Sequence, residues 1–212
     1  MSRLDKYLRR EDERSLLEKR MREEGRLPPG QAATIKWPVL HEGEIPAFDR
    51  AEWDFRVGGL VEEPLRFSYE AFLALPRIEV RSDFHCVTRW STFDNVWEGV
   101  GFRGLLARLR PQDRATHVMV LGQRGADPHG YSTNVALADL DREGVLFAYR
   151  NRGLDLTPEH GWPLRLVVPQ LYAWKSCKWV RGLVFMEQDR PGYWEGLGYH
   201  THGDPFREQR FS

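Results

Sequence analysis

The sequence of 212 residues contains only two cysteines, Cys86 and Cys177. So few cysteines exclude the multi-disulfide scaffold of a small secreted domain, although one bridge between these two remains open. No stretch approaches the roughly 20 apolar residues that a membrane-spanning helix needs. Arg9 and Arg10 are adjacent, but the apolar stretch of an export signal does not follow them. We therefore expect a cytoplasmic protein without a membrane span; a processed chain whose leader has been removed is the alternative.

The sequence also lacks an excess of charge of either sign. Lys and Arg together number 31, as do Asp and Glu, which gives a formal net charge of zero. Nucleic-acid binding needs a basic excess on one face, so no nucleic-acid partner is expected. Local positive pockets remain open, because net charge does not describe how charges are distributed.

The first part of the chain predicts a surface helix. Residues 3–24 contain no Gly or Pro and repeat opposite charges at spacings of three and four. The apolar stripe is thin and comprises Leu4, Tyr7, Leu8, Leu16, Leu17 and Met21. Such a stripe suits a helix that lies over a domain surface or a partner chain. We expect residues 1–34 to form an N-terminal helical extension and residues 35–212 to form the main domain.

Beyond residue 35 the sequence predicts many short strands and few short helices. Apolar alternation or apolar runs indicate strands at 53–57, 78–82, 118–120, 145–149, 164–168 and 178–186. Helices are expected at 69–75, which Ser68 can cap, and at 102–109. With 19 glycines and 13 prolines, this pattern is typical of a β-rich α+β domain. The last twenty residues are aromatic and polar, and we expect them to wrap over the surface or to line a pocket.

Cys86 lies in the segment DFHCVTRWSTFDNVWEGVGF, close to His85 and Arg89. Cationic neighbours lower the pKa of a thiol and favour the thiolate, which is the form that attacks substrates or binds metals. The alternative is a buried structural cysteine, which is the common fate of a free cysteine. The local residues alone favour this second interpretation.

A second segment, HGWPLRLVVPQLYAWKSCKWV, gathers groups that can bind phosphate. His160, Arg165, Lys175, Ser176 and Lys178 lie within nineteen positions. Arg offers a planar fork and Lys a point charge, and both suit phosphate oxygens. Two basic strand ends that face water would give the same pattern, and the residues alone do not decide between the two.

Five blocks of sequence, in this order, resemble the molybdopterin-binding domain of the sulfite oxidase family. They are HCVTRWS with WEGV, GYSTNVAL, HGWPLRLVVP, YAWKSCKWV and GYWEGLGYHTHGDPF, and the resemblance covers about residues 35–212. The family includes sulfite oxidases, plant assimilatory nitrate reductases and the catalytic subunit of a periplasmic methionine-sulfoxide reductase. The resemblance implies the family's β-rich α+β fold and a molybdopterin that carries molybdenum, with tungsten as the alternative metal.

The resemblance also implies roles for individual residues. Cys86 occupies the place of the molybdenum-ligating cysteine, and a soft thiolate suits a metal that takes two sulfurs from the pterin dithiolene. Tyr199 looks similar to a tyrosine that lines the substrate pocket, so Cys86 and Tyr199 form the expected catalytic set. The residues expected to hold the cofactor are His41, His160, Arg165, Lys175, Ser176, Cys177 and Lys178.

The sequence departs from the family at the arginines that bind sulfite. Val39 and Ser91 stand at two positions where sulfite oxidases carry such arginines, and Arg89 is near but unmatched. The resemblance therefore does not extend to an anion-binding substrate pocket.

We thus expect a molybdenum-cofactor oxidoreductase that transfers an oxygen atom, with two electrons, to or from a small oxyanion, sulfoxide or similar small-molecule substrate. Electrons would pass through a separate electron-transfer partner protein, because the sequence carries no second redox centre. One alternative is a non-catalytic molybdopterin-binding module or an inactive family member. Another is a thiol enzyme that uses Cys86 with His85 or His160.

Overall fold

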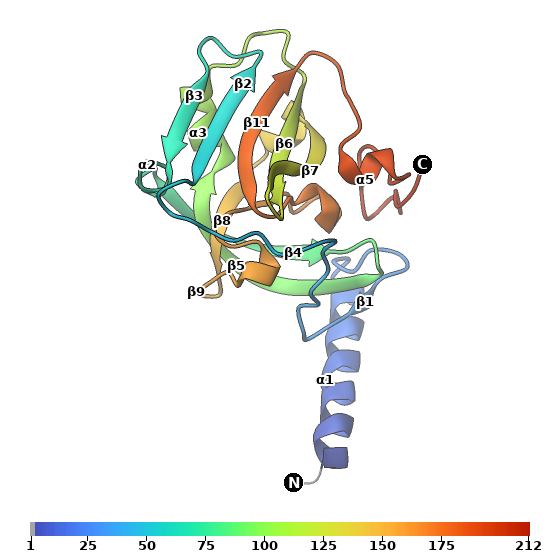
Figure 1. Cartoon of the computed structure of the whole chain (residues 1–212). Helices are drawn as coiled ribbons and strands as arrows, with labels where there is room; N and C mark the ends of the chain where they lie inside the picture. Colours follow the sequence, from blue (N-terminus) through green and yellow to red (C-terminus); the bar gives the residue numbers. More distant parts are fainter. Residues whose placement is uncertain (1–2) are drawn as a thin grey trace.

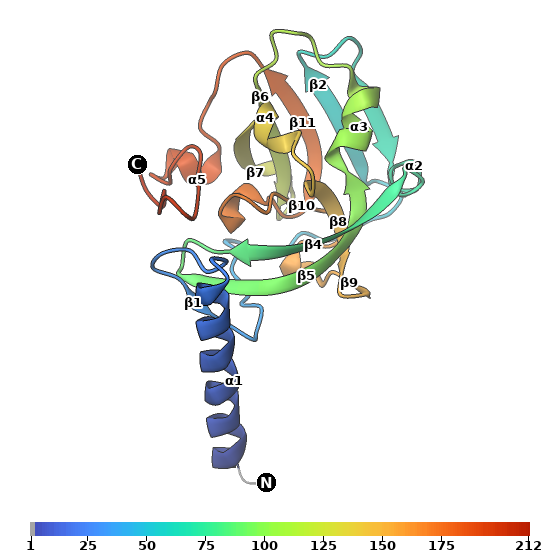
Figure 2. The ribbon, with the colours of Figure 1, turned by 180° about the vertical axis from the view of Figure 1, so that it is seen from behind.

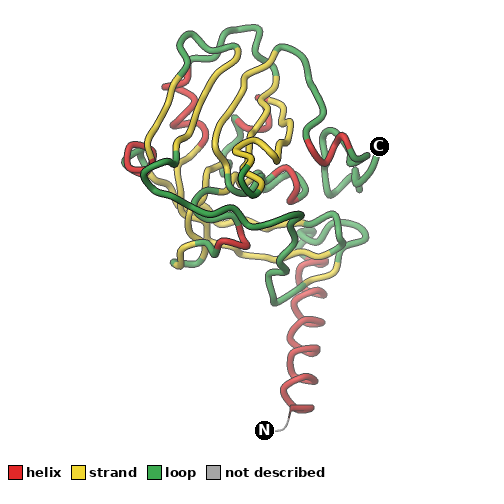
Figure 3. The backbone as a smooth tube through the Cα atoms, viewed as in Figure 1, coloured by secondary structure: helices red, strands yellow, loops and turns green. Residues whose placement is uncertain are grey.

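The structure is a computed structural model that describes residues 3–212, with the side chains of residues 9–127 and 130–212. Leu4, Tyr7 and Leu8 of the predicted apolar stripe therefore lie outside the described side chains. The described residues form two β-sheets joined by short helices and long loops (Figure 3). This architecture confirms the predicted β-rich α+β class.

One sheet has the strand order β1-β5-β8-β10, with β4 also paired to β5 and β9 also paired to β8. Its strands are β1 (Ala32–Ala33), β4 (Arg77–His85), β5 (Trp90–Gly101), β8 (Leu146–Asn151), β9 (Leu154–Asp155) and β10 (Arg165–Val167). β1 runs parallel to the start of β5, and the other pairs are antiparallel. The long antiparallel pair of β4 and β5 crosses the molecule below the second sheet (Figure 2).

The second sheet has the strand order β3-β2-β11-β6-β7. Its strands are β2 (Asp54–Gly59), β3 (Leu65–Ser68), β6 (His117–Arg124), β7 (Asp127–Ala136) and β11 (Val180–Met186). The main core lies between the sheets, where Phe55 of β2 meets Phe147 of β8 with ring centroids 5.3 Å apart. Burial of such large aromatic side chains supplies much of the stability of the domain.

The helices are short, apart from the first. They are α1 (Arg3–Glu23), α2 (Tyr69–Leu73), α3 (Phe102–Leu109), α4 (Leu137–Leu140) and α5 (Tyr193–Gly196), with 3₁₀ turns η1 (Pro158–His160) and η2 (Ala173–Lys175). The predicted helix at 102–109 is confirmed, and Ser68 caps α2 by accepting a hydrogen bond from the Ala71 amide. No described helix combines the length and the apolar character that a bilayer crossing requires.

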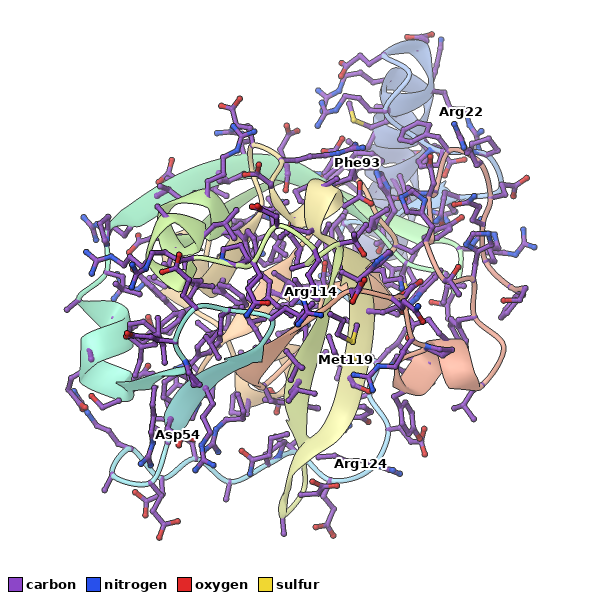
Figure 4. The ribbon with its side chains drawn as sticks, turned by 90° about the horizontal axis from the view of Figure 1, so that it is seen from above. Arg22, Asp54, Phe93, Arg114, Met119 and Arg124 are labelled. Carbon is purple, nitrogen blue, oxygen red and sulfur yellow. The ribbon has the colours of Figure 1, made fainter. Side chains whose placement is uncertain are left out.

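The predicted N-terminal helix is confirmed, but α1 projects away from both sheets and does not lie over the domain (Figure 1). Its exposed faces carry ion pairs three or four residues apart, such as Arg22 with Glu18 at 2.8 Å. Its last turn is anchored by Met21, which is buried with Leu27, Ala33 and Phe93. Figure 4 shows Phe93 beside the end of this helix, on the side of the molecule opposite Asp54. The domain boundary expected between residues 34 and 35 stays a prediction.

Candidate functional site

A cavity of about 250 Å³ lies where segments from the whole length of the domain meet. Its walls come from the loop before β2, the turn between β4 and β5, β7, the segment around η1 and η2, and the chain after α5. Among the predicted site residues, those that line it are His41, Cys86, His160, Arg165, Ser176, Cys177, Lys178 and Tyr199. Residues far apart in the sequence are therefore brought together in one place.

Cys86 enters the cavity from a tight turn that follows β4 directly. The Cys86 amide donates to Trp90 O at 2.9 Å, and the Arg89 amide donates to Cys86 O at 3.1 Å. Both cysteines are free, so the bridge left open by the sequence is not formed. Thr88 Oγ1 donates to Cys86 Sγ at 3.2 Å, which opposes the effect of burial on the thiol. Burial nevertheless raises the pKa of Cys86 above its ordinary value.

His85 and Arg89, which the sequence offered as cationic neighbours of the Cys86 thiol, do not act in that way. Neither residue lines the cavity. His85 is buried on the other side, where its Nδ1 lies 2.8 Å from Ser91 Oγ, and burial lowers its pKa to about 4. The cation that acts on Cys86 is Arg165, which comes from β10 and was not a neighbour in the sequence.

One wall of the cavity is cationic. Arg165 is 3% exposed and stacks over Phe84, with its guanidinium carbon 4.8 Å from the ring centroid. Its Nη1 donates to His160 O at 3.0 Å, whereas its Nε has no hydrogen-bond partner within the described residues. Burial lowers the pKa of Arg165 to about 10, so the side chain stays charged at neutral pH. Among the described residues that line the cavity, none carries a carboxylate.

Lys178 and His160 stand beside Arg165 on the same wall. Lys178 Nζ donates to Leu40 O at 2.7 Å and to Glu159 O at 2.5 Å. Burial and the charge of Arg165 lower the pKa of Lys178 to about 7, and the same two causes lower the pKa of His160. His160 stacks on Trp37 with ring centroids 3.9 Å apart. Arg165 gives this wall its full positive charge, and Lys178 and His160 add polar groups beside it, so the wall can receive an anion.

The remaining predicted cofactor residues that line the cavity differ in exposure, hydrogen bonding and protonation. His41 is exposed at the rim, with its Nδ1 3.1 Å from Gly43 O. Ser176 is buried, and its Oγ accepts from the Val168 amide at 3.0 Å. Burial raises the pKa of Cys177 to about 12, so this second thiol stays protonated.

Lys175 lies behind the wall and does not line the cavity. It is fully buried with Glu195, and Lys175 Nζ lies 2.7 Å from Glu195 Oε1. The same Nζ donates to Asn134 O at 2.8 Å and to Asn134 Oδ1 at 2.9 Å. Lys175 therefore has its own partners in the protein and is not directed at a bound group.

A second group of lining side chains, Trp174, Trp194 and Tyr199, forms an aromatic wall, and the expectation that the last twenty residues line a pocket is confirmed for Trp194 and Tyr199. Five of the eight tryptophans in the sequence line the cavity, namely Trp37, Trp90, Trp174, Trp179 and Trp194. Tyr199 lies between two of them, with ring centroids 5.2 Å from Trp174 and 5.3 Å from Trp194. Burial raises the pKa of Tyr199, so its hydroxyl keeps its proton at neutral pH. The aromatic last twenty residues were the signal for this wall in the sequence, whereas Trp174 was not predicted.

The positions where sulfite oxidases carry arginines do not face the cavity here. Val39 is 45% exposed and Ser91 is fully buried, and neither lines the cavity. Arg165 is the only arginine among the described lining residues.

Comparison with known proteins shows which family this chain belongs to. A family model described as "Oxidoreductase molybdopterin binding domain" matches residues 42–194. The chain belongs to this family. Within it, the chain is 44% identical over 189 residues to "Uncharacterized oxidoreductase YuiH" of Bacillus subtilis (strain 168), in a match that covers 89% of this chain and 93% of that protein.

More distant members of the family are larger proteins. A nitrate reductase [NADH] of Lotus japonicus is 28% identical over 74% of this chain, which spans 20% of that enzyme. The protein-methionine-sulfoxide reductase catalytic subunit MsrP of Gluconobacter oxydans (strain 621H) is 30% identical over 74% of this chain, which spans 54% of MsrP. The sulfane dehydrogenase SoxCD of Paracoccus pantotrophus superimposes with a TM-score of 0.59 at 24% identity, over 68% of this chain and 40% of that one, and shares the fold.

Proposed function

We propose that this chain is an oxidoreductase that binds a molybdopterin-carried metal in the cavity and transfers an oxygen atom to or from a small neutral substrate. The observation that carries the proposal is the convergence of the Cys86 thiol and the cationic wall of Arg165, Lys178 and His160 on one cavity. Molybdenum is the expected metal, and tungsten would suit the same ligand. The match to the family model already shows that the chain belongs to the molybdopterin-binding oxidoreductases, and the proposal concerns its metal, its reaction and its substrate.

The residues present fit such a cofactor. The buried Arg165 Nε has no partner within the described residues, and a phosphate oxygen would supply one. Lys178, His160 and the exposed His41 add donors on the same side. Cys86 supplies a soft sulfur ligand for the metal. The donor set therefore matches an anionic group at one end and a thiophilic metal at the other.

When bound, the cofactor would supply the two-electron redox chemistry of the reaction. Cys86 would lose its proton on binding the metal, because only the thiolate is a ligand and the free thiol has a raised pKa. Thr88 Oγ1 would keep the sulfur oriented through its hydrogen bond. Tyr199, which holds its phenolic proton, would donate a hydrogen bond to the oxygen of the substrate.

The aromatic wall favours a neutral substrate over sulfite or nitrate. Trp174, Trp194 and Tyr199 offer rings and one hydroxyl, and no arginine stands with them among the described lining residues. A neutral sulfoxide presents a polar oxygen and apolar substituents, which matches such a wall. A separate electron-transfer protein as partner and a cytoplasmic location both remain predictions.

The test uses full-length protein from a host that makes molybdopterin. Reduced methyl viologen should be oxidised faster with methyl p-tolyl sulfoxide than with nitrate, and ferricyanide should not be reduced with sulfite. Cys86→Ala should abolish the activity, whereas Cys177→Ala, at the other cavity-lining cysteine, should keep a measurable rate. Faster turnover of nitrate or sulfite would overturn the substrate class. Loaded protein that turns over none of these substrates would support a non-catalytic module instead.

A further inference from the structure

The turn that carries Cys86 is held by two side chains from outside the segment that the family model matches. That segment covers residues 42–194, whereas Gln31 precedes it and Arg210 follows it. Gln31 Nε2 donates to Cys86 O at 2.9 Å, and Arg210 Nη1 donates to Val87 O at 2.7 Å. Both side chains thus donate hydrogen bonds to consecutive carbonyl groups of the same turn.

Both residues are buried where they meet the turn. Gln31 is 3% exposed and Arg210 is 6% exposed. A long polar side chain loses rotamer freedom and hydration in such a place, and the hydrogen bonds to the turn compensate this in part, because Gln31 Oε1 and Arg210 Nε have no partner within the described residues. The arrangement is therefore a specific one rather than a chance surface contact.

The backbone around Gln31 is itself fixed to the start of β5. The Ala32 amide donates to Arg89 O at 3.0 Å, and β1 pairs Ala32 with Trp90. Glu18 of α1 adds to this by accepting from the Ala33 amide at 3.0 Å. The segment before the matched domain is thus built into the sheet edge beside Cys86.

Arg210 links three parts of the chain. Its guanidinium carbon lies 5.0 Å from the centroid of the Tyr172 ring, and its Nη2 donates to Pro29 O at 3.3 Å. Gly30 allows the approach, because a Cβ there would lie 3.2 Å from Arg210 Nη2 and 2.5 Å from Glu208 Oε1. The C-terminal segment and the segment before β1 therefore close together behind the turn.

We propose that Gln31 and Arg210 are positioning residues that set the direction in which Cys86 presents its sulfur to the metal. The proposal rests on the proposed function, because it takes Cys86 as the metal ligand. A thiolate bond to a metal depends on the orientation of the sulfur, and that orientation follows the backbone of the turn. Removal of a residue that hydrogen-bonds to a metal ligand and orients it typically lowers metal affinity or activity about 10- to 100-fold.

The test compares Gln31→Met and Arg210→Lys with two matched controls. Gln170→Met makes the same change at an amide that donates to Asp139 O at 2.8 Å, away from the cavity. Arg152→Lys makes the same change as Arg210→Lys, at a guanidinium that donates to Phe93 O at 2.9 Å. We measure the rate at which iodoacetamide alkylates Cys86 in cofactor-free protein, and the Mo(V) paramagnetic resonance spectrum and molybdenum retention of loaded protein.

We expect faster alkylation of Cys86, shifted Mo(V) g-values and about tenfold weaker retention of molybdenum or more in Gln31→Met and Arg210→Lys, while both controls match the wild type. Wild-type alkylation rates and spectra in these variants would overturn the proposal, even if their melting temperatures fall. A wild-type protein that takes up no molybdenum would refute the proposed function, and the alkylation rates would still report whether these residues hold the turn.

Discussion

Burial changes the chemistry of the charged and thiol side chains that line the cavity. It raises the pKa of Cys86 and lowers the pKa of Lys178 to about 7, while Arg165 keeps its charge. Without a bound anion, the cationic wall therefore holds poorly compensated positive charge near neutral pH. A bound phosphate group would compensate this positive charge and so bind favourably to the wall.

Lys178 should make the stability of the cofactor-free protein depend on pH. Its pKa is about 7 when folded and near 10.4 when unfolded, so above pH 7 the unfolded chain binds more protons. The free energy of unfolding should therefore rise between pH 7 and 8.5, by about 1.5 kcal/mol from this group. Urea unfolding of the wild type and Lys178→Met at both pH values checks this. An equal pH dependence in the two proteins would contradict the role given to Lys178.

The residues of the cationic wall were named from the sequence, but the different position of Lys175 was not predictable. Arg165 and Lys178 lie within nineteen positions of His160, which allowed a phosphate-binding cluster as one of two interpretations, and the family resemblance favoured it. Lys175 looks the same in sequence, and its partner Glu195 lies on α5 with no local signal that joins them. A single sequence does not show which charged residue has a partner elsewhere.

At the scale of elements, the pair of Lys175 and Glu195 fastens α5, η2 and β7 together. Glu195 Oε1 also accepts from Trp174 Nε1 and from Thr133 Oγ1, both at 3.0 Å. Thr133 and Trp174 line the cavity, so the buried pair holds the aromatic wall from behind.

Removal of one member of this pair should be costly. Lys175→Met leaves the Glu195 carboxylate buried without its cation, and we expect the free energy of unfolding to fall by about 3–5 kcal/mol. The double variant Lys175→Met with Glu195→Gln should recover much of the loss, because no charge remains buried. Arg9→Met, which breaks an exposed pair with Glu13, should change little. Denaturant titrations of the wild type and the three variants measure these changes. A small fall in the free energy of unfolding of Lys175→Met would contradict a stabilising role for the buried ion pair.

The elements that the sequence revealed are those with regular apolar spacing, such as α3. β7 was not predicted, because Thr133 and Asn134 are polar and yet buried against Glu195 and Lys175. β5 was also missed, since buried Ser91, Thr92 and Asn95 interrupt its apolar pattern. Polar residues in these strands read as loop unless their distant partners are known.

At the scale of the whole molecule, the cavity joins segments from Trp37 to Tyr199. A group bound there contacts the native state and not the unfolded chain, so it should stabilise the entire domain. A concentration 100 times the dissociation constant gives about 3 kcal/mol, or about 5–10 °C in a chain of this size. Calorimetry of protein from hosts with and without molybdopterin synthesis measures the difference. Equal melting temperatures would count against a cofactor in this cavity.

Molybdenum K-edge X-ray absorption tests most directly whether Cys86 binds the metal. Wild-type protein from a cofactor-competent host should contain about one molybdenum per chain, with two sulfur neighbours from the pterin and one from the protein. In Cys86→Ser, the sulfur count should fall by one, whereas Cys177→Ser should leave it unchanged. An unchanged sulfur count in Cys86→Ser, or a wild type without molybdenum, would contradict the account.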